Sequence, residues 1–135
     1  MLASVAERKT YNIRVMRHDA VDVLAHMIPA GSLARVLLFF PDPWHKKRHH
    51  KRRILQTETV ESIENVLQPG GVLHCATDWQ EYADAMLTEL DARSRLKNLA
   101  GSGFSDRPDY RPDTRFERRG LRLGHAVHDL LYQKI

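Results

Sequence analysis

Residues 36–53 read VLLFFPDPWHKKRHHKRR, an unbroken apolar run that stops at two prolines and gives way to a dense group of cations. Five consecutive apolar residues are typical of a strand buried on both faces of a parallel sheet, so we expect the central strand at residues 36–40. After the prolines, residues 45–53 include six Lys or Arg. The pattern predicts a buried strand whose end leads directly into a positively charged surface.

The positive charge of the chain is concentrated in this one segment. The 135 residues contain 21 Lys and Arg against 17 Asp and Glu, and outside residues 39–53 the balance is 15 to 16. A local cationic patch attracts a polyanion, and nucleic acid is the commonest such partner. A solvated helix start has the same composition, so charge alone leaves both interpretations open.

Strand and helix patterns alternate on both sides of this segment. The expected elements are strands at residues 12–16, 36–40 and 72–76 and helices at 21–28, 49–67 and 80–96, with Asp19 as an N-cap and Glu58, Glu61 and Glu64 facing solvent. Residues 2–9 resemble the last turns of a helix. This order predicts an α/β fold with a parallel sheet, in which ligands bind where the strands end.

The C-terminal third of the chain is less regular. Residues 100–119 are rich in Gly, Pro, Asp and Arg, which predicts a long surface loop, and we favour a functional role for it. A looser basic set in and after this loop either contacts a ligand or is simply solvated: Arg107, Arg111, Arg115, Arg118, Arg119 and Arg122. Residues 126–132 fit a final strand, paired antiparallel at the sheet edge.

Length and composition indicate a single domain over residues 1–135. The one cysteine, Cys75, lies in an apolar run, so we expect a core residue in a reducing compartment rather than a disulfide or a metal ligand. Neither a membrane-spanning segment nor a signal peptide is recognised. A cytoplasmic location is therefore expected.

Asp42 and Trp44 are the strongest chemical candidates. Because Asp42 precedes a proline, its backbone is biased toward an extended form, which would hold the carboxylate at the strand end. Taken alone, Asp42 fits better as a turn residue that caps the next helix. An aromatic residue next to a fixed carboxylate and a basic run is, however, suited to stacking a base, holding its polar edge and gripping its phosphates.

Three histidines in the basic run raise the question of a metal site. His45 and His49 are four residues apart, but six neighbouring cations would repel a divalent ion, so we predict no metal. These histidines are expected to lie against RNA or to cover the surface. A DNA-reading helix over residues 46–53 is a weaker alternative, because the α/β context favours chemistry on a flipped base.

Four motifs in a fixed order carry a more specific resemblance. HDAV at residues 18–21, FFPDPWHKKRHHKRR at 39–53, ATDW at 76–79 and RPDTRFERRG at 111–120 make the chain similar to the bacterial tRNA (guanine-N7-)-methyltransferase family. The similarity runs from about residue 12 to the C-terminus. It implies a Rossmann-like class I fold, S-adenosylmethionine as cofactor, and transfer of a methyl group to guanine 46 in the tRNA variable loop.

The resemblance also implies roles for individual residues. Asp42 matches the catalytic residue and borders the cofactor, whose adenosine end Asp19 would meet. Substrate contacts are implied for Lys46, Asp78, Thr114, Arg115, Phe116 and Glu117, and RNA contacts for Arg48, His49, His50, Lys51, Arg52 and Arg53. Arg115 stands where some relatives have lysine, which keeps the charge but changes its geometry.

The implied chemistry needs positioning more than proton transfer. The N7 atom of guanine already has a free lone pair, so no general base is required. A carboxylate such as Asp42 can hold the donor edge of guanine and offset the positive charge that develops on the ring.

One feature departs from the family pattern. Class I methyltransferases hold the cofactor on a Gly-rich loop after the first strand and on an acid after the second, and none of the seven glycines here makes such a turn. The chain is therefore expected to be the C-terminal part of the fold, lacking its first strands and most of the cofactor site. The alternative function is a truncated, catalytically inactive RNA-binding fragment. An exposed apolar sheet edge should favour association, although the oligomeric state is not predicted.

Overall fold

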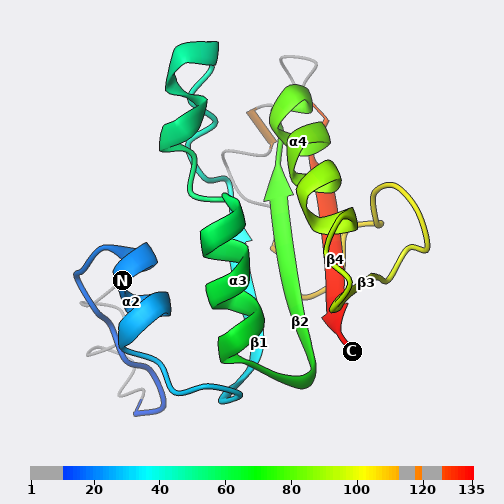
Figure 1. The fold of residues 1–135 in the computed structure, drawn as a ribbon. Coiled ribbons are helices and arrows are strands. Elements are labelled where there is room, and N and C mark those ends of the chain that lie inside the picture. The colour runs from blue at the N-terminus through cyan, green and yellow to red at the C-terminus, as the bar shows by residue number, and fades with distance from the viewer. Residues whose placement is uncertain (1–10, 113–117, 120–125) are drawn as a thin grey trace.

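The computed structural model describes residues 11–112, 118–119 and 126–135, which form a sheet with helices packed on it (Figure 1). The strands of the described residues are β1 (Leu33–Phe39), β2 (Leu67–Thr77), β3 (Leu96–Asn98) and β4 (His128–Lys134). The helices are α2 (Ala20–His26), α3 (Thr57–Val66) and α4 (Gln80–Asp91), together with the 3₁₀ helix η1 (Lys47–Arg52).

The strands lie in the order β1-β2-β4-β3. β1 and β2 are parallel, whereas β4 is antiparallel to both β2 and β3. The α/β class and the parallel pairing of the first two strands are confirmed, as is the antiparallel final strand. Its expected place at the edge is wrong, because the three-residue β3, too short for a recognisable pattern, pairs on its outer side.

The expected central strand also lies elsewhere. β1 overlaps the expected residues 36–40 but begins three residues earlier and ends one earlier, and it is an edge strand of the described sheet, in which Leu37 keeps 49% of its surface exposed. β2 and β4 take the interior places, since each is hydrogen bonded on both sides. An apolar run indicates that a strand can be buried on both faces, but only the packing of other elements decides whether it is.

The main core lies between one face of the sheet and α3 and α4 (Figure 1). Ile63 of α3 and Met86 of α4 meet Leu73 and Leu130 of the sheet, and all four are almost fully buried. Cys75 lies in this cluster as a free thiol, as expected, and burial raises its pKa to about 12. Among the described residues, no helix has the length and apolar content needed to cross a membrane.

The long helix expected at residues 49–67 is two separate helices. η1 ends at Arg52, and α3 begins at Thr57, because the backbone between them is extended, with φ −61° and ψ 139° at Arg53. One tertiary hydrogen bond and two local ones hold this break open: the Leu55 N–H donates to the hydroxyl of Tyr82 at 3.3 Å, and the Gln56 amide donates to the backbone oxygens of His50 and Arg53. Sequence periodicity carries no trace of the distant partner, Tyr82.

Glu64 was expected to face solvent, but it is buried in the structure. Its carboxylate accepts two hydrogen bonds from the guanidinium of Arg93, at 2.8 and 2.9 Å. Arg93 follows α4, which ends at Asp91 rather than at residue 96. The sequence therefore predicted the inward-facing apolar side of this segment, but it did not predict that Glu64 is buried and paired with Arg93.

The expected strand at residues 12–16 is absent from the sheet. These residues are exposed and make no strand pairing with the described chain, so their alternating apolar pattern has no neighbour to complete a ladder. The helix after them is confirmed as α2, with Asp19 as the N-cap: its carboxylate accepts from the Val21 N–H at 3.0 Å. The helix end expected at residues 2–9 lies outside the described residues.

We expect the chain to self-associate as its concentration rises. The outer edge of β1 pairs with no strand of the described chain, and such edges recruit further strands. Light scattering behind size-exclusion chromatography should show a mass that grows with loading. Replacing Leu37, the exposed apolar residue of this strand, with lysine should reduce the effect, whereas a wild-type mass of 15.6 kDa at all concentrations would contradict it.

Candidate active site at the ends of β1 and β2

The turn that follows β1 holds Asp42 in an unusual backbone. Phe40 and Trp44, on either side of it, both have positive φ angles of 51° and 45°, a conformation that bulky residues rarely adopt. One carboxylate oxygen of Asp42 accepts a hydrogen bond from the Trp44 N–H at 2.9 Å. Asp42 itself is exposed to solvent. Backbone strain of this kind persists only where surrounding contacts enforce it, and it is common at functional sites.

The end of β2 lies beside this turn. The Trp79 N–H donates to the hydroxyl of Thr77 at 3.2 Å, which fixes the short connection from β2 to α4. The ring of His45 packs on Trp79 with centroids 3.9 Å apart and planes inclined by 34°. Two motifs more than thirty residues apart in the sequence, the one around Asp42 and the one around Asp78, therefore meet at one edge of the sheet, as the alternating pattern predicted.

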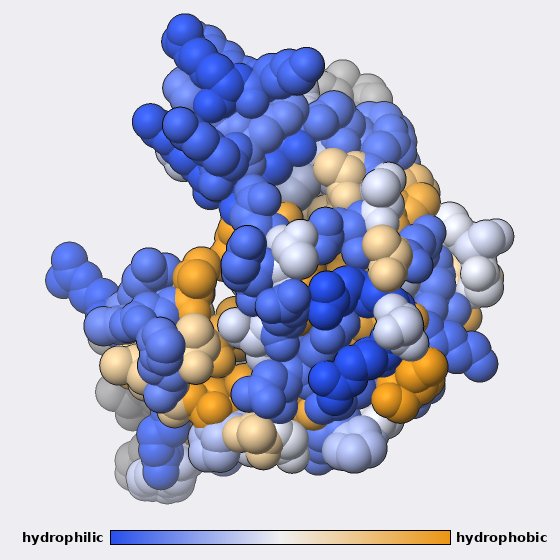
Figure 2. Space-filling view, viewed as in Figure 1, coloured by the Kyte–Doolittle hydropathy of each residue, from blue (hydrophilic) through white to orange (hydrophobic). Residues whose placement is uncertain are grey.

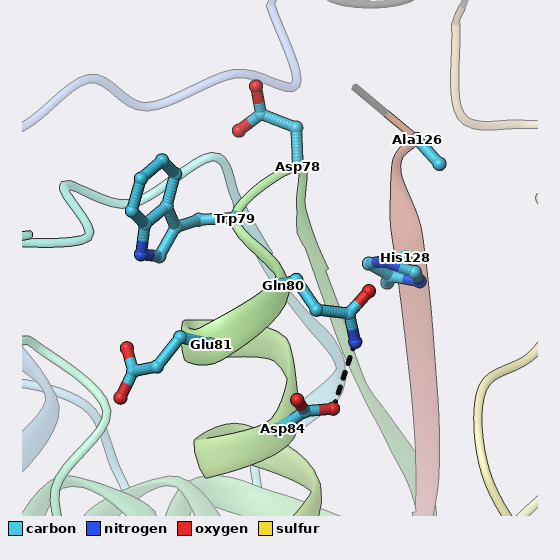
Figure 3. A pocket seen from close by; sticks show the side chains of 7 residues that line it. All are labelled: Asp78, Trp79, Gln80, Glu81, Asp84, Ala126 and His128. Atoms are coloured by element: carbon cyan, nitrogen blue, oxygen red, sulfur yellow. Dashed lines mark hydrogen bonds between the residues drawn. The ribbon is translucent and has the colours of Figure 1, made fainter. Parts of the chain in front are cut away.

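A pocket of about 480 Å³ opens next to Asp78 (Figure 3). Figure 3 shows Asp78 and Trp79 projecting from the β2–α4 connection, while Gln80 reaches toward His128 of β4 and donates to Asp84 at 3.0 Å. The remaining lining residues are Glu81 and Ala126. An aromatic wall with several carboxylates suits a planar ligand that presents N–H donors or carries positive charge.

The basic run forms a hydrophilic lobe over η1. Figure 2 shows this lobe at the upper left of the molecule. Lys46, Arg48, Lys51 and Arg52 are exposed, as a nucleic-acid contact requires. The guanidinium of Arg52 lies 5.2 Å from the centre of the Trp44 ring.

The histidines of the run pack locally. His49 meets the Trp44 ring edge to face, with centroids 5.9 Å apart, and His50 lies 3.8 Å from Glu81. The described residues contain no group of three side chains able to ligate a metal.

Arg53 differs from the rest of the predicted RNA-contact stretch. Only 5% of its surface is exposed, and its guanidinium is hydrogen bonded to the backbone oxygen of Pro43 and to both carboxylate oxygens of Glu81. This placement does not favour the predicted contact with RNA. A basic run read from sequence gives no sign that one member turns inward.

Asp19, the other predicted cofactor residue, borders a groove. The neighbours of Asp19 in the chain, His18 and Ala20, line it together with Leu37 and Leu38 of β1. Figure 2 shows apolar atoms exposed in the recess between α2 and the rest of the molecule. The carboxylate of Asp19 caps α2 with one oxygen, so the cap leaves its other oxygen available to a ligand.

A buried polar network on the other face of β2 was missed by the sequence analysis. Asp129 accepts hydrogen bonds from Arg111 at 2.7 and 2.8 Å and lies 2.6 Å from the ring of His74, whose other nitrogen is 2.8 Å from the Tyr110 hydroxyl. Arg111 is only 1% exposed. Its assignment to a loose solvated or ligand-binding set is therefore wrong. A pairing across 18 residues leaves no local signal in the sequence.

The other residues of that arginine-rich segment are less fully defined. Arg107, Arg118 and Arg119 are exposed. The predicted substrate motif, Thr114, Arg115, Phe116 and Glu117, lies outside the described residues, as does Arg122. Their predicted contacts stay predictions, and so do those of Asp19, Asp42, Lys46, Asp78 and the RNA-contact stretch.

Residues 1–130 match a family model described as "Putative methyltransferase". The chain belongs to this methyltransferase family. The match includes both strand ends that form the candidate site, so the geometry of residues 42–46 and 77–79 is that of a methyltransferase chain.

Curated relatives of this methyltransferase chain carry a more specific name. The tRNA (guanine-N(7)-)-methyltransferase of Ralstonia pickettii is 56% identical over 134 residues, covering 99% of this chain and 52% of the relative. The protein of the same name from Paracidovorax citrulli is 55% identical over 135 residues, covering 100% of this chain and 54% of the relative. The chain therefore spans about half the length of the relatives it matches.

Solved structures support the Rossmann-like methyltransferase fold. An rRNA methylase from Streptococcus thermophilus superimposes with a TM-score of 0.61 at 13% identity, over 99% of this chain and 64% of that one. An S-adenosylmethionine-dependent O-methyltransferase from Thermotoga maritima gives a TM-score of 0.56 at 12% identity, over 98% of this chain and 44% of that one. At such low identity the likeness concerns the fold alone.

Proposed function

We propose that this methyltransferase chain takes part in transferring a methyl group from S-adenosylmethionine to the N7 atom of guanine 46 in tRNA. The observation that carries the proposal is the 56% identity to a curated tRNA (guanine-N(7)-)-methyltransferase over nearly the whole chain. It is supported by the contact between the two strand ends, where His45, three residues after Asp42, packs on Trp79, and by the pocket that Asp78 and Trp79 line. A tRNA substrate would place this activity in the cytoplasm.

The residues fit the cofactor at two points. Asp42 lies at the carboxyl end of a strand, and Asp19 combines an available carboxylate oxygen with an apolar groove, which suits the amino group and flat ring of adenine. When bound, S-adenosylmethionine supplies an electrophilic methyl group. The chain's own contribution is to hold the guanine with Asp42 and Asp78, and its sugar and phosphates with Lys46 and the exposed cations of η1.

A catalytically inactive RNA-binding fragment is the less favoured alternative, because the relatives that match the full chain are named for the methyl transfer itself. The two can be separated on one sample. Titration calorimetry would measure binding of S-adenosylmethionine to the 135-residue chain, and a gel shift would measure binding of unmodified tRNA.

Although the Gly-rich loop of class I methyltransferases is expected to lie outside this chain, the proposal requires both ligands to bind, and methylated nucleosides in the digested tRNA should be N7-methylguanosine. Binding of tRNA without the cofactor would support the inactive fragment instead. Failure of tRNA to bind at low salt would overturn the proposed substrate.

A further inference from the structure

Arg53 joins three parts of the candidate site. Its Nε donates to the backbone oxygen of Pro43 at 2.6 Å, and its Nη1 donates to one carboxylate oxygen of Glu81 at 3.3 Å, while Nη2 pairs with the other. The guanidinium also lies 4.4 Å from the centre of the Tyr82 ring. Pro43 belongs to the turn after β1, whereas Glu81 and Tyr82 lie in the first turn of α4, directly after Asp78 and Trp79.

The turn held by Arg53 is the strained one. Positive φ angles at Phe40 and Trp44 flank Asp42, and such a conformation needs contacts that enforce it. The hydrogen bond from Arg53 to Pro43 lies inside this segment, between Asp42 and Trp44. The bidentate pairing with Glu81 then fixes that hydrogen bond relative to α4.

Resting on the proposed function, we propose that Arg53 is a positioning residue: it holds the turn at residues 41–44 against α4 and so sets the carboxylate of Asp42 relative to Asp78. This differs from the RNA contact that its place in the basic run implies. Three of its nitrogen atoms already have acceptors, its surface is 5% exposed, and Glu81 balances its charge. A phosphate would have to displace these partners.

The salt dependence of tRNA binding separates the two roles. A plot of log affinity against log salt has a negative slope. Each lost phosphate contact makes this slope shallower by about 0.7–0.9, because fewer counterions are released. Lys51, an exposed cation two residues away, provides the matched control. We expect Lys51→Met to make the slope shallower by that amount and Arg53→Met to leave it unchanged. An equal fall for both variants would overturn the proposal.

Tryptophan signals give a readout that needs neither RNA nor activity. The chain has two tryptophans, and both lie in the site: Trp44 in the held turn, Trp79 against His45. In a ¹H–¹⁵N spectrum, Arg53→Met and Glu81→Gln should shift both indole signals in the same direction, while Lys51→Met shifts neither. Unmoved indole signals in the Arg53 and Glu81 variants would contradict the positioning role.

The Arg53→Lys variant provides a second test in case Arg53→Met does not fold. Lysine keeps the charge that a phosphate would need but cannot make the bidentate pairing with Glu81. We expect this variant to bind tRNA as the wild type does, with a KM within twofold, and to lose at least tenfold in kcat. Unchanged kcat would overturn the proposal. If wild-type protein bound no tRNA, the proposed function would fail, while the indole signals would still decide the role of Arg53.

Discussion

Replacing Asp42 with alanine is expected to lower methyl transfer by about 100- to 1,000-fold, the range found when one preorganised electrostatic contact to a transition state is removed. The carboxylate belongs to the turn after β1, whose His45 packs on Trp79, and it is proposed to accept from the donor edge of guanine and to offset charge developing on the ring. Transfer of a labelled methyl group to unmodified tRNA measures the loss. Affinity for tRNA should change less than twofold, because the proposed phosphate contacts lie in η1.

The Asp42→Asn variant separates the effect of the carboxylate charge from the effect of the hydrogen bond that holds the turn. Asparagine keeps an oxygen that can accept from the Trp44 N–H, so the turn should survive while the negative charge is lost. We expect Asp42→Asn to be nearly as inactive as Asp42→Ala, and Asp106→Asn, at an exposed carboxylate, to keep full activity. An active Asp42→Asn would assign Asp42 to holding the turn. Equal losses of tRNA binding and transfer would remove its catalytic role.

Replacing Arg111 with methionine is expected to destabilise the fold by about 3–5 kcal/mol, because it leaves the buried Asp129 without its main counterion. Both side chains are at most 3% exposed. Urea unfolding at pH 7 measures the change. Arg107→Met, at an exposed position in the same loop, should stay within about 0.5 kcal/mol of the wild type. A similarly small effect at Arg111 would show that the pair contributes little.

The same network predicts an acid dependence. Burial raises the pKa of Asp129, but hydrogen bonds from His74 and Arg111 outweigh this effect and hold it below the usual 3.8. A carboxyl with a lowered folded pKa stabilises the protein above its unfolded pKa, and that stabilisation is lost as pH falls through the folded value. The stability gap between wild type and Asp129→Asn should therefore be constant from pH 7 to about 5 and shrink below about pH 4. A gap that widens in acid would contradict this.

Local sequence signals predicted the parts of the fold that depend on neighbouring residues. The Asp19 cap, the apolar strand expected at residues 36–40 and the placement of Asp42 and Asp78 at the ends of strands all follow from short-range patterns. Cys75 was predicted as a core residue for the same reason, since it lies within a mainly apolar run. These features need no knowledge of which other segment packs against them.

The features that the sequence did not predict share the opposite cause, which is a partner distant in the chain. Arg53 and Arg111 look alike in sequence, as members of basic segments, but acids 28 and 18 residues away bury them. The break before α3 likewise depends on the hydroxyl of Tyr82. The apolar run alone predicted a central position for β1, because such a run shows what a strand tolerates and not what covers it.

Alkylation of the buried thiol of Cys75 can be used to measure how often the core of the chain opens. It is the one cysteine in the sequence, and with none of its surface exposed and its pKa raised to about 12, it offers an alkylating reagent neither access nor thiolate. Modification therefore requires the core beneath α3 and α4 to open. The rate of labelling, followed by mass, reports the free energy of that opening without any added probe.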